Sequence, residues 1–160
     1  MGKVESAGAE RRRSARLAGR HAPLVIDVPR QPRKKINKTQ QCFDVVWAAL
    51  VADDAAALER QLDAERVELR RAGGPMFTWA VVKSQRRCAT LLFGRIPLLD
   101  SFWGMICMTF AMLRPNRGDL VDALSRRFGI ERRLDMFIFD EAAFGEHVRR
   151  EIRAGIECAQ

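Results

Sequence analysis

The chain has 160 residues, of which 28 are Lys or Arg and 20 are Asp or Glu, so that its formal net charge is +8. This length suffices for one modest hydrophobic core or a short stack of repeats, but hardly for two independent domains. All of the excess charge lies in residues 1–41, where 11 basic residues accompany three acidic ones, whereas residues 42–160 hold 17 of each. The sequence therefore divides into a basic tail and a neutral body.

Residues 1–41 have the composition of a segment that is disordered on its own. Two basic clusters, over 11–20 and 30–38, flank the short apolar island PLVIDVP, and no helical period of apolar residues runs through the segment. It lacks the apolar core of a secretory signal, and its acidic residues are atypical of a mitochondrial presequence. We therefore predict a disordered basic tail over 1–41.

The basic clusters of this tail are candidates for contacting an anion. Disordered basic arms bind acidic surfaces, nucleic acid or import receptors through charge. Phosphorylation of Ser14, which lies within ERRRSARL, would add negative charge and weaken such a contact. The alternative is a tail that only solubilises the chain. The residues expected to contact an anion or nucleic acid are Arg11, Arg12, Arg13, Arg16, Arg33, Lys34 and Lys35.

A helical hairpin is predicted over residues 43–62. In FDVVWAALVADDAAALERQL, apolar residues share one helical face, Asp53 and Asp54 interrupt it, and Leu58 with Leu62 resume it. The spacing indicates a helix, a short acidic turn and a second helix.

The stretch GGPMFTWAVVKSQRRCATLLFG, residues 73–94, repeats this plan 31 residues later. Ser84 and Gln85 take the place of the two aspartates, and Ala89 and Phe93 take the place of the two leucines. Self-similarity at a fixed period is typical of stacked repeats. We therefore predict a second hairpin.

A third hairpin is predicted from MTFAML and GDLVDALSRRFG, with Val121 and Leu124 on its apolar face. The uncharged run SFWGMICMTFAML, residues 101–113, is shorter than the roughly 20 residues that a membrane span needs. We expect it to form a buried core helix.

A fourth hairpin is expected to close the chain, with a break around Gly145 and Val148 and Ile152 on its second helix. Gly94, Gly129 and Gly155 would then each follow a second helix. Glycine there suits the left-handed residue that ends many helices.

At these residues the chain resembles the ankyrin repeat family, whose unit of about 33 residues has two antiparallel helices and a turn. The likeness lies in Ala80, in the polar turn at Ser84 and Gln85, and in the apolar run over 91–93. The stretches GDLVDALSRRFG and REIRAGIE look like the second helix and exit of later units, whereas PMFT replaces the family's Thr-Pro-Leu-His opening. The resemblance implies an all-α fold, a short α-solenoid of three to four divergent ankyrin-like hairpins over 42–160. A less regular helical bundle is the alternative.

The sequence contains no catalytic or metal-binding pattern. It lacks phosphate-loop, dinucleotide, zinc-protease and serine-hydrolase motifs, and its four cysteines form no C-x-x-C pair. We expect a protein that is not an enzyme, without cofactor or metal, and with the buried reduced thiols of an intracellular protein. Aromatic residues at helical spacing are expected to fill the core rather than to bind a ligand. These are Phe77, Trp79, Phe102, Trp103, Phe110, Phe137 and Phe139.

These features predict a non-catalytic protein–protein interaction module, cytoplasmic or nuclear and not membrane-bound. Its stacked hairpins would present a concave surface to another protein, and the tail would add a contact with acidic or nucleic-acid surfaces or serve nuclear import. The alternative is a nucleic-acid or nucleoprotein-associated structural protein that binds mainly through the tail.

Overall fold

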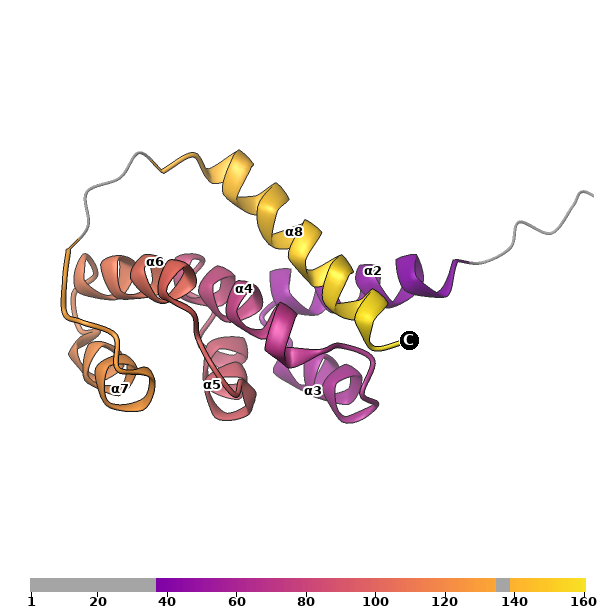
Figure 1. Ribbon diagram of the computed structural model, residues 1–160, viewed down its shortest axis with the longest axis horizontal. Coiled ribbons are helices and arrows are strands. Elements are labelled where there is room, and N and C mark those ends of the chain that lie inside the picture. Colours follow the sequence, from indigo (N-terminus) through magenta and orange to yellow (C-terminus); the bar gives the residue numbers. More distant parts are fainter. Residues whose placement is uncertain (1–36, 135–138) are drawn as a thin grey trace, which may run out of the picture. The chain divides into compact units, whose positions relative to one another are not determined.

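Helices make up all the regular secondary structure of the part of the chain that the structure, a computed structural model, describes: residues 37–134 and 139–160. The all-α prediction is confirmed for these residues (Figure 1), and none of their helices is long and apolar enough to cross a membrane. The helices are α2 (Lys38–Val51), α3 (Ala55–Asp63), α4 (Leu69–Val82), α5 (Arg86–Arg95), α6 (Ser101–Met112), α7 (Gly118–Phe128) and α8 (Glu141–Cys158). The candidate tail residues, Arg11, Arg12, Arg13, Arg16, Arg33, Lys34, Lys35 and Ser14, lie outside the described ranges, as does Phe137.

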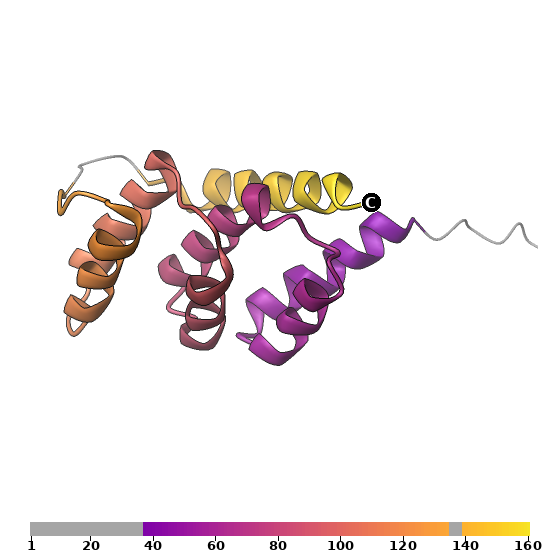
Figure 2. The ribbon, with the colours of Figure 1, turned by 60° about the horizontal axis from the view of Figure 1, so that its bottom comes forward.

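Three of the predicted hairpins are present as pairs of packed helices, α2 with α3, α4 with α5, and α6 with α7. Neighbouring hairpins contact each other where α4 packs on α6 and where α3 packs on α5. Helices α2, α4 and α6 form one layer, and α3, α5 and α7 lie beside it (Figures 1 and 2). Helix α2 begins at Lys38, with Asn37 as its N-cap, so residues 38–41, which were expected to belong to the tail, are helical.

The first two hairpin turns have the same backbone structure. Asp53 and Ser84, 31 residues apart, both adopt a left-handed conformation, with φ of 54° and 61°. In each turn the amide of this residue donates to the carbonyl three positions back, and the next amide donates to the carbonyl five positions back. These two bonds define a Schellman helix end, formed here without glycine. The third turn is longer, and its left-handed residue is Asn116, with φ of 62°.

The predicted fourth hairpin is wrong. Residues Glu141–Cys158 form one continuous helix, and the expected break at Gly145 lies inside it. Gly155 is also inside α8, and Gly94 is inside α5, so neither ends a helix. Only Gly129 has the expected role, because it caps α7 with φ of 67°.

Helix α8 packs along α4 and α2, on the side away from the second helices (Figures 1 and 2). Gly155 makes this close approach possible, since a Cβ there would lie 2.6 Å from the Cβ of Ala72. The carbonyl of Gly155 also accepts a 3.0 Å hydrogen bond from the amide of Glu68. At Gly145 a Cβ would lie 3.4 Å from the ring of Trp79. Both glycines therefore serve as contact points between helices.

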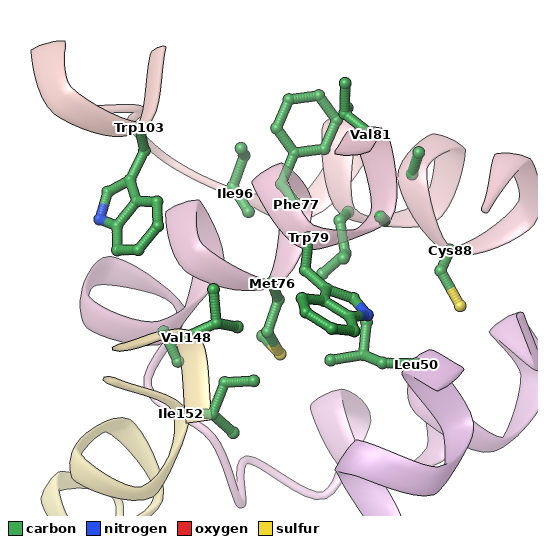
Figure 3. Packing of buried hydrophobic residues seen from close by; sticks show 14 of the residues in the cluster. Leu50, Met76, Phe77, Trp79, Val81, Cys88, Ile96, Trp103, Val148 and Ile152 are labelled. Atoms are coloured by element: carbon green, nitrogen blue, oxygen red, sulfur yellow. The ribbon is translucent and has the colours of Figure 1, made fainter. Parts of the chain in front are cut away.

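The hydrophobic core is centred on α4, which is buried along its whole length from residue 72 to residue 82. Helices α5, α6 and α8 all pack against it. Figure 3 shows its side chains Met76 and Trp79 lying between Leu50 of α2 and Ile152 of α8. Because the surroundings are apolar on every side, α4 carries an almost continuous apolar run rather than one stripe.

Two expectations about burial need correction. Phe102, predicted in the core, is 50% exposed and lies with its ring edge against His147 and Trp103. Cys158 is exposed, whereas Cys42, Cys88 and Cys107 are buried, and all four are free thiols. The other described aromatic residues of the predicted core are buried or packed against it.

The two helical glycines at 94 and 155 predict opposite effects of the same substitution. Gly94→Ala should raise the free energy of unfolding by about 0.5–1 kcal/mol, because nothing lies within 4 Å of the new methyl group and Ala favours helix. Gly155→Ala should lower it by about 1–3 kcal/mol, because the methyl group would overlap the Cβ of Ala72. Urea unfolding of both variants measures the difference, and stabilisation by both would contradict the close approach of α8 to α4.

Candidate interaction surface

The hairpin turns lie side by side and form one surface, which we call the turn edge and define as residues 51–54, 82–87 and 112–118. Hydrogen bonds link the first turn to the second. The carboxylate of Asp53 accepts from the amides of Arg87, at 3.3 Å, and Cys88, at 2.8 Å, at the start of α5. In return, the side-chain amide of Gln85 donates to the carbonyl of Val51 at 3.2 Å. The second helix of one hairpin is thus capped from the turn of the previous one.

Arg114 links the third turn to the second. Its guanidinium donates to the carbonyl of Val81 at 3.1 Å, and also contacts the carbonyl of Val82 and the hydroxyl of Ser84. These carbonyls lie at the C-terminal end of α4, where a cation is favoured by the helix dipole. The three turns are therefore held in register by side chains that bond across hairpins.

Three arginines, Arg86, Arg114 and Arg117, lie at the second and third turns. Burial lowers the pKa of Arg117, and the positive charges of Arg86 and Arg114 lower it further. Among residues 37–134 and 139–160, neither Arg86 nor Arg117 forms an ion pair. The guanidinium groups of Arg86 and Arg117 are therefore not held by a carboxylate of the described part of the chain.

Large apolar side chains are exposed beside these cations. Leu113 is 62% exposed, Val51 is 54% exposed and Met112 is 41% exposed. Leu113 and Met112 directly precede Arg114 in the chain. Aromatic residues, Met and Arg are enriched in protein interfaces, and an apolar patch rimmed by polar groups is typical of them.

Some arginines elsewhere on the described surface are engaged within the fold. Arg95 pairs with Glu59 at 3.1 Å and with Asp63 at 2.9 Å. Arg127 donates to the carbonyl of Ile96 and lies 4.8 Å from the ring centroid of Phe93. Near the end of the third hairpin, Arg126 donates to the carbonyl of Asp122, and Arg132 pairs with the carboxylate of Asp122.

The described structure also contains buried thiols and a groove that bear on its chemistry. Burial raises the pKa of the Cys88 and Cys107 thiols to about 12, so both stay protonated near neutral pH. No group of three or more His, Cys, Asp or Glu side chains within the described ranges could hold a metal ion. A groove of about 790 Å³ lies beside Cys42, between the start of α2 and the end of α3. Amide, apolar and charged side chains line it.

No family model matches the sequence, and no curated protein or solved structure shows significant similarity to it. The resemblance to ankyrin repeats therefore stays a prediction.

Sequence reasoning concentrated on the tail and missed the arginines of the turn edge. A signal for them does exist. The turns read KSQR over 83–86 and RPNR over 114–117, so an arginine closes each turn, at the first residue of α5 and at the N-cap of α7. In stacked repeats successive turns become neighbours.

Asp53 provides a test of the bonding across turns. Burial alone would raise the pKa of Asp53, but the amides of Cys88 and Arg87 donate to its carboxylate and hold the pKa below its ordinary value. Asp53→Ala should therefore lower the free energy of unfolding by about 1 kcal/mol at neutral pH. Asp53→Asn should be milder, because Asn also caps helices.

The pH dependence of this effect has a definite sign. A carboxylate with a lowered pKa in the folded state contributes its stability above its unfolded pKa of about 3.9, and loses it as the pH falls through the folded value. The stability difference between the wild type and Asp53→Ala should therefore be constant near neutral pH and shrink below about pH 4. Urea unfolding at neutral and acidic pH measures it, and an unchanged difference at acidic pH would argue against a charge-dependent cap.

Proposed function

We propose that the chain is a non-catalytic protein–protein interaction module that binds its partner through the turn edge. In this proposal the packed hairpins form a short ankyrin-like α-solenoid. The observation that carries it is the turn edge itself, where cross-hairpin hydrogen bonds hold exposed apolar and cationic side chains in fixed register. A surface that is ordered before binding loses less conformational entropy on association.

The position of α8 favours the turn edge over the faces of the first helices. Helix α8 packs on α4 and α2 and buries Val148, Ile152 and Ile156. A partner could reach those faces of α4 and α2 only by displacing a helix that belongs to the core. The turns, by contrast, project beyond the helices that they connect. We therefore propose the turn edge, rather than a concave face of first helices, as the docking surface.

The basic tail has a separate role in this proposal. It would add an electrostatic contact with acidic or nucleic-acid surfaces or with an import receptor, because all of the net charge of +8 falls within residues 1–41. The same observation favours the second candidate function, a nucleic-acid or nucleoprotein-associated structural protein that binds mainly through the tail. Binding of that kind would weaken steeply with salt, as phosphate counterions are released.

Capture of partners by the full chain and by two variants separates the two functions. In the tail variant, Arg11, Arg12, Arg13, Arg16, Arg33, Lys34 and Lys35 are replaced by Gln. The second variant is Leu113→Ser, which removes the most exposed apolar side chain of the turn edge. We expect the tail variant to keep a protein partner after nuclease treatment and at raised salt, and Leu113→Ser to lose about tenfold or more in affinity.

Leu98→Ser is the matched control, because Leu98 is 49% exposed but lies in the connection between α5 and α6, away from the turns. Its affinity for the partner should match that of the wild type. Loss of all binding in the tail variant, together with sensitivity to nuclease, would favour the nucleic-acid function instead.

A further inference from the structure

We infer that the partner segment bound at the turn edge is acidic, a stretch of protein in which carboxylate side chains alternate with apolar ones, held by Arg86 and Arg117. This inference rests on the proposed function and specifies the chemistry of the partner. It does not extend to the basic tail.

The two arginines are placed to grip the same ligand. Arg86 is the first residue of α5, and Arg117 directly precedes α7, so each stands where a hairpin turn passes into its second helix. Arg114 fixes the second and third turns to each other, because its guanidinium donates hydrogen bonds to carbonyls at the end of α4. Arg86 is exposed and Arg117 is half-buried, and neither forms an ion pair in the described part of the chain.

The carboxylates near these turns form no ion pair with Arg86 or Arg117 in the described part of the chain. Asp53 accepts two backbone hydrogen bonds at the start of α5, and Asp54 caps α3 by accepting from the amide of Ala57 at 2.9 Å. Asp119 lies two residues after Arg117 but forms no ion pair with it in the described part of the chain. Burial lowers the pKa of Arg117, and the positive charges of Arg86 and Arg114 lower it further.

A carboxylate is the group that such a pair fits. The planar guanidinium of Arg donates two parallel hydrogen bonds to a carboxylate, and charge-assisted bonds of this kind are about twice as strong as neutral ones. An anionic ligand would also relieve the mutual repulsion of the arginines. The turn edge therefore gains stability when it binds an acid, beyond the contacts themselves.

The surroundings favour a protein segment over nucleic acid. Nucleic-acid binding surfaces are long basic stripes that neutralise several phosphates, whereas the turn edge offers a compact cluster within a body of equal acidic and basic content. Exposed Met112 and Leu113 lie next in the chain to Arg114. They suit the apolar side chains of a peptide and have no counterpart in a phosphate backbone.

The test uses the full chain and two fluorescein-labelled peptides. One is built of repeated Glu-Leu-Asp units, and the other has Gln and Asn in place of Glu and Asp. The edge variant is Arg86→Gln with Arg117→Gln. The control variant is Arg60→Gln with Arg70→Gln, because both residues are exposed, form no ion pair among the described residues and lie at the opposite ends of α3 and α4 from the turns.

Fluorescence anisotropy should show that the edge variant binds the acidic peptide about tenfold or more weakly than the wild type does. The control variant should bind it as the wild type does, although both variants lose the same charge and both keep the tail. The wild type and the control variant should both bind the amide peptide more weakly than the acidic peptide. Circular dichroism of both variants establishes that they are folded.

Two results would overturn the inference. Equal weakening in the edge and control variants would show that binding follows net charge alone. A greater effect of the edge variant on binding of an oligothymidylate than on binding of the acidic peptide would assign the arginines to nucleic acid.

Capture of the protein partner separates this inference from the proposed function. If Leu113→Ser abolishes capture while the edge variant retains it, the proposed function stands and the acidic partner is wrong. If neither variant affects capture, the turn edge is not the docking surface.

Discussion

The close packing of α8 against α4 is the contact on which the rest of the structure depends. Helix α4 has apolar side chains on nearly every side, and three hairpins alone would leave its face opposite α5 in water. Helix α8 covers that face with Val148 and Ile152. Because Gly155 has no side chain, α8 approaches Ala72 of α4 more closely than a residue with a Cβ would allow. The ring of Trp79 then joins the layers, since it lies 4.7 Å from Trp47 and 6.0 Å from Phe144, centroid to centroid.

Burial of α4 also explains why the chemistry of the chain is concentrated at the turns. The amides and carbonyls at the helix ends are not satisfied within the helices, and the end of α4 lies next to the third turn. Arg114 and Asp53 supply these missing bonds from neighbouring hairpins. The same bonds that complete the helices align the turns, so one set of interactions gives both stability and a surface of fixed geometry.

The hairpins could be predicted from the sequence because their signals are local. Apolar residues recur at helical spacing, and the residues that break the pattern, Asp53 and Ser84, turn out to be the left-handed ends of helices. The last helix could not be predicted in the same way. Gly145 and Gly155 are residues that often end a helix. In the structure they lie against Trp79 and Ala72, which are more than 60 residues away in sequence. A glycine that allows close approach and a glycine that ends a helix are indistinguishable until the long-range contact is known.

The turn edge was hidden for a related reason. The net charge of residues 42–160 is zero. This sum does not show which arginines form ion pairs and which do not. The fold brings Arg95 to two carboxylates, whereas Arg86 and Arg117 lie at two linked turns and form no ion pair in the described part of the chain. A body with zero net charge can thus carry a local cationic surface. The counter-charge of such a surface can come from another molecule, which is the physical basis of the acidic partner that we propose.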